Sequence, residues 1–270
     1  MSVGTPGRLQ DRVAIVTGGA SGIGKAICTE LAAQGARVVV ADIDVDVATQ
    51  TVFELEKAGV MALVVPVDVR DPSSTEAAAA AVCDRFGTID ILVNCAGINR
   101  FKRADEFSVV EWESIRSVNL DGPWHCCQAV LPTMMEKRYG KIVNIASASG
   151  MRATPHAAPY STSQHGLIGL TRSLAVDLGL HGINANCVCP AAVDSPLIQE
   201  SASEQYRQKM IERLPLGRLG QATDIAKAVA FLASDAAAWI TGVVLPVDGG
   251  LSCCNYGRHE EGRQLPDRDT

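Results

Sequence analysis

A glycine-rich segment near the start of the chain has the residue types of a phosphate-binding turn. Residues 17–24 read TGGASGIG and lie between an apolar run and a stretch of helical periodicity. Glycines at 18, 22 and 24 allow a tight turn and a close approach to a pyrophosphate, while the next helix would present free N–H groups to the anion. The spacing differs from G-x-G-x-x-G, so the place between strand and helix, more than the glycines alone, indicates a dinucleotide site.

A carboxylate stands where it could hold the other end of such a dinucleotide. Asp42 ends the second apolar run, 18 residues beyond Gly24. A carboxylate at this point can accept hydrogen bonds from the adenosine ribose hydroxyls and would repel a 2′-phosphate. No Arg or Lys flanks it, and position 21 is Ser. These features favour NAD(H) over NADP(H); the alternative reading of Asp42 is a turn residue at a strand end.

Short apolar runs alternate with longer helical stretches along the whole chain. This alternation predicts βαβ units and an α/β fold, with a parallel sheet covered by helices on both faces. The expected strands are residues 13–16, 37–41, 61–65, 89–93, 141–145, 183–188 and 243–247. The expected helices are residues 24–34, 45–58, 73–86, 109–138, 161–180 and 222–233.

No Pro-, Gly- or Ser-rich linker and no internal repeat divides this series. We therefore expect a single dinucleotide-binding and catalytic domain over residues 1–250, followed by a polar tail over 251–270. Residues 194–215 interrupt the alternation and predict a partly helical loop or lid near the ligand.

The composition excludes several classes of protein. The net charge of −6 argues against a nucleic-acid partner, and 47% apolar residues exclude a mainly disordered chain. No apolar run approaches roughly 18 residues, and the first residues lack the apolar stretch of a signal peptide, so we expect a cytoplasmic protein with no membrane partner. The nine cysteines and five histidines lack metal-binding spacing, which predicts reduced thiols and no metal.

The motifs of this chain, in their order, resemble those of the short-chain dehydrogenase/reductase family over roughly residues 10 to 250. They are the glycine-rich turn, Asp68-Val69, the Asn94-Cys95-Ala96-Gly97 segment, Asn119, Ser147 and Tyr160. The set is far more specific than any one member. The resemblance implies a single seven-stranded, doubly wound Rossmann-type sheet and a homo-oligomer, either a dimer or a homotetramer. Helices 109–138 and 161–180 would pair across its two-fold axis.

The resemblance also implies contacts with an NAD cofactor. Asp68 and Val69 would meet the adenine, Asn94 would steady the central strand, and Ser195 would contact the nicotinamide carboxamide. The complete predicted cofactor set is Gly18, Ser21, Gly22, Ile23, Gly24, Asp42, Asp68, Val69, Asn94, Ala96, Gly97, Tyr160, Gln164, Pro190, Val193 and Ser195.

The predicted catalytic residues follow from the chemistry that the family performs. Hydride transfer between an alcohol carbon and nicotinamide requires a coupled proton transfer at the oxygen. Tyr160 is the candidate acid and base, and Ser147 would hydrogen-bond the same oxygen as charge develops on it. Asn119 would hold a water in a proton relay; the alternative is a mid-helix Asn that faces solvent.

One departure from the family pattern bears on this mechanism. The family has Tyr-x-x-x-Lys, whereas this chain has Gln164 four residues after Tyr160, on the same face of a helix. A glutamine can hydrogen-bond the nicotinamide ribose but cannot lower the tyrosine pKa by its charge. At ~4 Å and an effective dielectric of ~20 that charge is worth roughly 4 kcal/mol, or about three pKa units. His165 points about 100° away and is no direct replacement.

Two smaller departures lie in the sixth strand region: Ala191 follows Pro190 where glycine is usual, and Asn184 stands where arginine is common. The leading hypothesis is thus an NAD(H)-dependent oxidoreductase that interconverts a secondary alcohol and a ketone. The alternative is an NAD(H)-binding protein with weak or no redox activity, used as a regulatory or repurposed scaffold.

The substrate is only partly indicated. Arg152 and His156 lie between Ser147 and Tyr160 and could bind an anionic alcohol or ketone. Residues 100–103 add three more cations after the fourth strand, but a solvated loop is the favoured interpretation of that cluster.

Overall fold

The computed structural model describes residues 8–194 and 203–254 of the chain. They form one seven-stranded parallel sheet, as the sequence predicts, and its strand order is β3-β2-β1-β4-β5-β6-β7. The strands are β1 (Val13–Thr17), β2 (Arg37–Asp42), β3 (Ala62–Pro66), β4 (Ile91–Asn94), β5 (Gly140–Ile145), β6 (Ile183–Pro190) and β7 (Val244–Val247). The order reverses between β1 and β4, and open sheets of this kind bind ligands at the carboxyl ends of the strands beside such a reversal.

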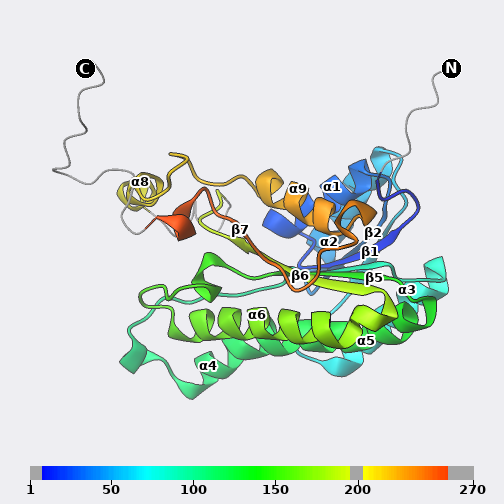
Figure 1. Ribbon diagram of the computed structural model, residues 1–270, viewed down its shortest axis with the longest axis horizontal. Coiled ribbons are helices and arrows are strands. Elements are labelled where there is room, and N and C mark those ends of the chain that lie inside the picture. Colours follow the sequence, from blue (N-terminus) through cyan, green and yellow to red (C-terminus); the bar gives the residue numbers. More distant parts are fainter. Residues whose placement is uncertain (1–7, 195–202, 255–270) are drawn as a thin grey trace, which may run out of the picture.

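Helices cover both faces of the sheet (Figure 1). They are α1 (Gly22–Ala33), α2 (Val45–Lys57), α3 (Pro72–Phe86), α4 (Val109–Arg116), α5 (Gly122–Lys137), α6 (Ala158–Leu178), α8 (Glu204–Glu212) and α9 (Ala222–Leu232). Figure 1 places α1, α2 and α9 on one face and α3, α5 and α6 on the other. None of the described helices is long and apolar enough to cross a membrane.

Successive side chains of β2 pack into two separate hydrophobic cores, one on each face of the sheet. Val38 and Val40 of β2 pack with Ile27 in the layer of α1 and α9, whereas Val39 packs with Met134 in the layer of α3 and α5. All five are fully buried. Since a strand buried on both faces needs apolar residues at successive positions, the continuous apolar runs of the sequence predict a parallel sheet.

Local signals fix the ends of several helices. Asp71 caps α3 by accepting a hydrogen bond from Ser73 N, Pro72 occupies the first turn, and Gly87 ends the helix with a left-handed φ of 76°. Pro159 likewise lies in the first turn of α6, where its missing N–H has no cost. The helix therefore begins at Ala158 rather than at the predicted residue 161, which places Tyr160 in its first turn.

The predicted helix 109–138 is wrong in one respect, because it is interrupted. Between α4 and α5, residues Ser117–Asp121 form a π-helical turn in which Gly122 N donates to Ser117 O. Such turns insert an extra residue and often mark functional sites. The predicted lid contains α8, while residues 195–202 and most of the predicted tail lie outside the described residues.

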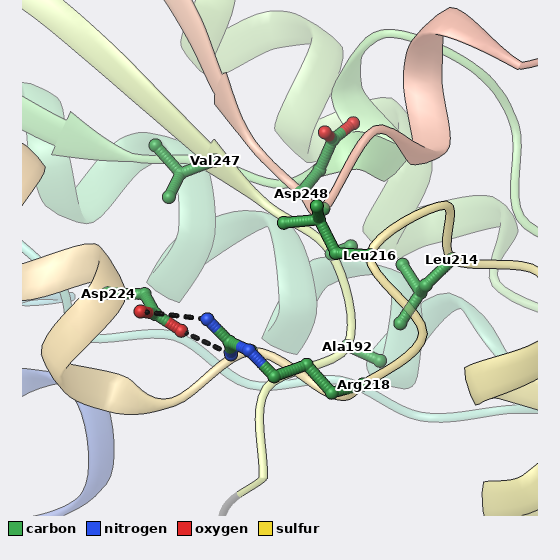
Figure 2. Close-up of a pocket in the computed structure, with 10 residues that line it drawn as sticks. Ala192, Leu214, Leu216, Arg218, Asp224, Val247 and Asp248 are labelled. Atoms are coloured by element: carbon green, nitrogen blue, oxygen red, sulfur yellow. Dashed lines mark hydrogen bonds and ion pairs between the residues drawn. The ribbon is translucent and has the colours of Figure 1, made fainter.

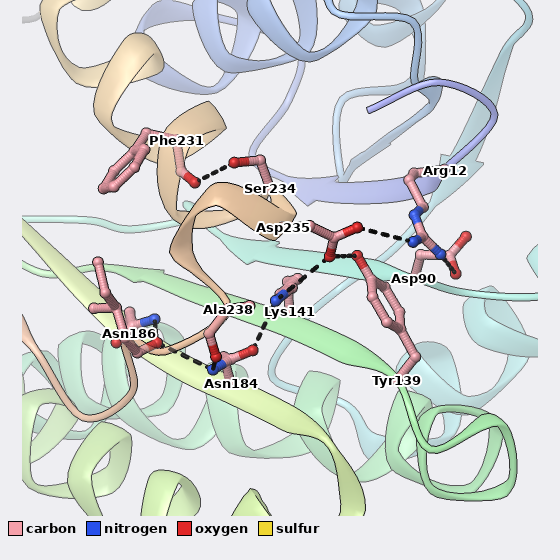
Figure 3. Close-up of polar contacts among 11 residues, drawn as sticks. Arg12, Asp90, Tyr139, Lys141, Asn184, Asn186, Phe231, Ser234, Asp235 and Ala238 are labelled. Atoms are coloured by element: carbon pink, nitrogen blue, oxygen red, sulfur yellow. Dashed lines mark hydrogen bonds and ion pairs between the residues drawn. The ribbon is translucent and has the colours of Figure 1, made fainter. Parts of the chain in front are cut away.

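A polar cluster lies at the amino ends of the strands, remote from their carboxyl ends (Figure 3). Lys141 of β5 is 3% exposed, and its Nζ donates to Asn184 Oδ1 at 2.7 Å. The Asn184 amide in turn donates to the carbonyl oxygens of Ala238 and Ile240, both at 3.1 Å. Asn184, where the family often has arginine, thus helps tie β5 and β6 to the chain that precedes β7.

Candidate active site

The glycine-rich turn connects β1 to α1 and is packed so tightly that side chains would not fit. A Cβ atom on Gly24 would lie 2.0 Å from Gly18 O, and a Cβ on Gly18 would lie 2.9 Å from Ala96 N. Gly18 also has a left-handed φ of 65°, and no acidic residue occupies the first turn of α1. At Gly22, by contrast, nothing lies within 4 Å of the Cβ position, so the turn exposes backbone at the N-terminus of α1, as anion binding requires.

Asp42 lies at the carboxyl end of β2, beside this turn. Its Oδ2 accepts a hydrogen bond from Ala20 N at 3.0 Å, and its Oδ1 accepts one from Asp44 N at 3.1 Å. The carboxylate is only partly buried. Asp42 therefore supports the turn structurally and still presents acceptor capacity to solvent, so the structural and the ligand-binding interpretations are compatible.

The predicted adenine-contacting pair follows β3. The Asp68 carboxylate is held by Arg70, with Nη2 to Oδ2 at 2.6 Å, and this hydrogen bonding lowers the pKa of Asp68. Val69 is buried, and its carbonyl oxygen lies 3.0 Å from His125 Nδ1. Arg70 is thus a partner of the Asp68 carboxylate that the sequence analysis does not predict.

A buried hydrogen-bond chain supports the carboxyl end of β4. Asn94 Nδ2 donates to Asn144 Oδ1 at 2.8 Å, and Asn144 Nδ2 donates to Thr171 Oγ1 at 2.8 Å. Thr17 Oγ1 accepts from the backbone N of Cys95 and of Ala96, at 3.0 and 3.2 Å. Asn94 Oδ1 is buried without a partner among the described residues. This network joins four elements beneath the glycine-rich turn.

Asn119 lies within the π-helical turn and is 2% exposed, so the solvent-facing alternative is wrong. Its Oδ1 accepts from Ile98 N and its Nδ2 donates to Ile98 O, both at 2.8 Å, and Nδ2 also donates to Ser163 Oγ at 3.3 Å. The side chain therefore fixes the chain just beyond Gly97.

Ser147, Tyr160 and Gln164 come together at the carboxyl end of β5 and the start of α6. Burial raises the pKa of Tyr160, while hydrogen bonding by the side chains of Ser147 and Gln164 acts to lower it. Ser147 also accepts a hydrogen bond from Ser149 N at 3.0 Å, which orients its hydroxyl. Gln164 is 4% exposed, and its Oε1 has no partner among the described residues.

Two thiols that sequence reasoning treated as apolar fillers lie beside this group. Cys189, near the end of β6, receives a hydrogen bond from the Ser147 backbone N–H, and its Sγ lies 3.7 Å from Cys187 Sγ. Cys189 and Cys95 each contribute to raising the pKa of Tyr160. In the part of the chain that the structure describes, none of the groups that shift the pKa of Tyr160 is a cation.

A small pocket of about 270 Å³ lies at the carboxyl ends of β6 and β7 (Figure 2). Leu214, Leu216 and the residues after Pro190 line it, and Arg218 Nη1 pairs with Asp224 Oδ2 at 2.7 Å across its floor. Val193 bridges to Gly220 beside it. Ala191, the departure from the usual glycine, is one of the lining residues.

The remaining predicted site residues are placed as follows. Ser21 and Ile23 are part of the turn and the start of α1, and Gly97 is exposed beyond β4. Arg152 is partly buried and His156 exposed, both on the chain between β5 and α6. Ser195 lies outside the described residues. Within residues 8–194 and 203–254, no group of His, Cys, Asp and Glu side chains is arranged to hold a metal ion.

A glycine-rich turn, a strand-end carboxylate and a serine–tyrosine pair on one edge of a doubly wound sheet are typical of nucleotide-dependent oxidoreductases. The chain belongs to the short-chain dehydrogenase/reductase family: residues 18–252 match the family model described as enoyl-(acyl carrier protein) reductase.

The chain is 40% identical to (2S)-[(R)-hydroxy(phenyl)methyl]succinyl-CoA dehydrogenase subunit BbsD of Thauera aromatica, over 90% of this chain and 98% of the relative. It is 36% identical to the 3-oxoacyl-[acyl-carrier-protein] reductase FabG of Thermotoga maritima, over 90% of this chain and 99% of the relative. The crystal structure of gox2181 superimposes with a TM-score of 0.90 and 39% identity, covering 92% of this chain and 98% of that one. These relatives are dehydrogenases and reductases where their names state an activity.

Proposed function

We propose that the protein is an NAD(H)-dependent oxidoreductase that interconverts a secondary alcohol and a ketone by hydride transfer. The observation that carries the proposal is the place of Tyr160 in the first turn of α6, where the Ser147 and Gln164 side chains act to lower its pKa, on the sheet edge that also bears the glycine-rich turn. The names of the relatives support the reaction type, since one dehydrogenates a hydroxy compound and another reduces a 3-oxo group.

The residues present fit a nicotinamide dinucleotide. At Gly22, in the same turn, no atom lies within 4 Å of where a Cβ would be, so a ligand can approach the backbone there, and the start of α1 has the polarity to receive a pyrophosphate. Gln164 Oε1 is a buried acceptor without a partner in residues 8–194 and 203–254, which fits a ribose hydroxyl as its donor. When bound, the nicotinamide ring supplies or accepts the hydride.

The protein side chains supply the proton and stabilise charge at the oxygen. In reduction, Tyr160 gives its phenolic proton to the carbonyl oxygen, and Ser147 donates a hydrogen bond to the charge that develops there. Gln164 orients the phenol without adding charge. Because burial raises the pKa of Tyr160, the phenol is protonated at neutral pH, which is the form that reduction needs.

Substitution of Tyr160 by Phe tests the proposed chemistry. We expect Tyr160→Phe to lower kcat for ketone reduction by about 10²–10⁴-fold, the usual contribution of a positioned acid, with NADH binding nearly unchanged. Turnover would be followed by NADH absorbance over a ketone and alcohol panel, and binding by NADH fluorescence.

The alternative function is supported by Gln164, because this uncharged residue stands where the family has a lysine beside the tyrosine. An NAD(H)-binding scaffold with little redox activity would bind NADH tightly and give no turnover with any member of the panel. Turnover that Tyr160→Phe abolishes excludes this alternative.

The NAD preference rests on Asp42 and has its own test. Asp42→Asn removes the negative charge but keeps an acceptor for Ala20 N or Asp44 N, so the turn should persist. We expect NADPH affinity to rise by about tenfold, because a nearby like charge costs a phosphate at least ~1 kcal/mol. Asp44→Asn, two residues further on, is the matched control. Equal affinity of the unaltered protein for NADH and NADPH would contradict the NAD assignment.

A further inference from the structure

Two cysteines of β6 place their sulfur atoms close together on one face of the sheet. Cys187 and Cys189 are two residues apart on a strand, so their side chains point the same way, and both pack in one core with Leu167 and Ile168 of α6. Val188, between them, belongs to the core on the opposite face. The two Sγ atoms lie 3.7 Å apart, and both residues are 0% exposed. The proposed redox chemistry uses neither thiol.

The strand that carries these two thiols is held from both sides. Cys187 N donates to Val243 O, and Ala146 N donates to Val188 O, both at 2.9 Å. In an extended strand, residues i and i+2 are about 6.6–6.8 Å apart at Cα, which is the upper limit for a disulfide. To close the gap from 3.7 Å to the roughly 2.05 Å of an S–S bond, the strand would have to bend against these hydrogen bonds. A single atom that bridges the two sulfurs needs no such contraction.

The pair lies beside the candidate catalytic group. Ala146, which bonds Val188 O, directly precedes Ser147, so the register of β5 and β6 places Ser147 next to Cys189. Ala191, two residues beyond Cys189, lines the pocket of about 270 Å³ in Figure 2. The sulfurs are covered, and a reagent reaches them when this end of β6 opens. Reaction should therefore be slow but should not require unfolding of the core.

The two thiols differ in their readiness to react. The Cys187 thiol donates a hydrogen bond to the Cys189 sulfur, and this lowers the pKa of Cys189. Since the thiolate is the nucleophilic form, Cys189 is the sulfur expected to react first and Cys187 the one that closes the bridge.

We propose that Cys187 and Cys189 form a dithiol site that captures a trivalent arsenical, a soft centre that prefers sulfur ligands. With phenylarsine oxide, two arsenic–sulfur bonds replace the bonds between arsenic and oxygen, and the oxygen leaves as water with the two thiol protons. Arsenic stays trivalent and neither sulfur is oxidised, so the step needs no oxidant.

Mass spectrometry tests the site without turnover, so its failure is separate from failure of the proposed redox function. The full chain carries Cys253→Ser and Cys254→Ser, because these adjacent thiols lie outside the core and would compete. The folded protein is treated with phenylarsine oxide and then with excess glutathione, and its intact mass is measured. We expect one phenylarsenic group per chain that glutathione, a monothiol, does not remove and that the dithiol dimercaptopropanol does remove.

Variants in the same background locate the adduct. Cys187→Ala and Cys189→Ala each leave one thiol, and we expect each to weaken retention against glutathione by about 10²-fold or more, because the second bond is formed within one molecule. Cys126→Ala, which removes a buried thiol of α5, is the matched control and should not alter retention. Circular dichroism checks folding, and a serine variant replaces any alanine variant that does not fold. No retained adduct, or retention that Cys187→Ala leaves unchanged, overturns the proposal.

The position of the pair has a consequence that rests on the proposed function. An arsenic atom between the two sulfurs displaces Ser147, and a shift of about 1 Å in such a group can cost about 10²-fold in rate. We expect phenylarsine oxide to lower kcat for ketone reduction to this extent in the Cys253→Ser, Cys254→Ser protein and not in its Cys187→Ala derivative. An adduct that leaves kcat unchanged would show that the site does not act on the catalytic group.

Discussion

At the scale of single residues, burial and the absence of a charge at Gln164 both bear on the pKa of Tyr160. Burial raises the pKa of Tyr160, and the groups that oppose this rise, Ser147 and Gln164, act only by hydrogen bonding. Alcohol oxidation needs the phenolate, so its rate should increase with pH through the alkaline range. Ketone reduction needs the protonated phenol, so its rate should stay level across neutral pH.

Substitution of Gln164 by Lys should make alcohol oxidation faster at neutral pH. A charge ~4 Å from the phenol at an effective dielectric of ~20 would lower the tyrosine pKa by about three units. We expect Gln164→Lys to raise the oxidation rate at pH 7 by about 10²-fold and to shift its pH profile to lower pH. The profiles of kcat in both directions, measured from pH 6 to 10.5, check this.

Gln164→Leu is the control for this experiment, because it removes the hydrogen bond without adding charge and should not accelerate oxidation. If oxidation by the unaltered protein is already maximal near pH 7, another group must lower the tyrosine pKa and the argument from Gln164 fails.

The sequence predicts those residues of the site whose spacing along the chain carries the signal. Gly18 and Asp42 follow from their places at the ends of the first two strands, and the structure puts both at one sheet edge. Asn144 and Thr171 were missed, because their role depends on hydrogen bonds between segments that only the folded sheet brings together. Cys189 was missed for the same reason.

At the scale of elements, all seven strands were predicted to within two residues at either end. The inner strands are largely buried on both faces and are therefore mostly apolar runs, whereas the edge strands β3 and β7 are less buried but still apolar in sequence. The break between α4 and α5 was not predicted. Helical periodicity continues through residues 109–138. Two features favour the break: Pro123 has no N–H to donate to Asn119 O, and the Asn119 side chain bonds the backbone of Ile98, 21 residues earlier.

This contact makes the π-helical turn sensitive to one substitution. Asn119→Ala leaves the N–H and the carbonyl of Ile98 without their partners, and we expect a loss of about 1–3 kcal/mol in the free energy of unfolding. Urea denaturation followed by circular dichroism measures it. Ser163→Ala keeps both Ile98 contacts of Asn119. It removes the longer third contact of Asn119 and the hydrogen bond from Ser163 Oγ to Tyr160 O at 2.8 Å, and should cost about 1 kcal/mol or less. Equal losses in the two variants would contradict this role of Asn119.

At the scale of the whole molecule, carboxylates paired with surface cations determine how stability responds to acid. Hydrogen bonds to Arg or Lys lower the pKa of six of them, namely Asp11, Glu54, Asp68, Asp105, Glu111 and Asp224. A carboxyl group with a lower pKa in the folded state than in the unfolded state binds fewer protons when folded. Its contribution to stability is present above the unfolded pKa and disappears as the pH falls through the folded pKa.

Glu111 allows this response to be isolated, because its pKa is lowered from 4.5 to about 2 by Lys102 and Ser108. We expect the urea midpoint of the unaltered protein to be level from pH 7 to 5 and to fall from about pH 4.5 towards pH 2. Glu111→Gln should have a lower midpoint at neutral pH and a shallower fall in that acid range, since it has no proton to gain there. Glu113→Gln, on the same helix but without an ion pair to a described residue, should retain the slope of the unaltered protein. If the urea midpoints of all three proteins fall in parallel as the pH is lowered, the Lys102–Glu111 pair does not contribute to acid sensitivity.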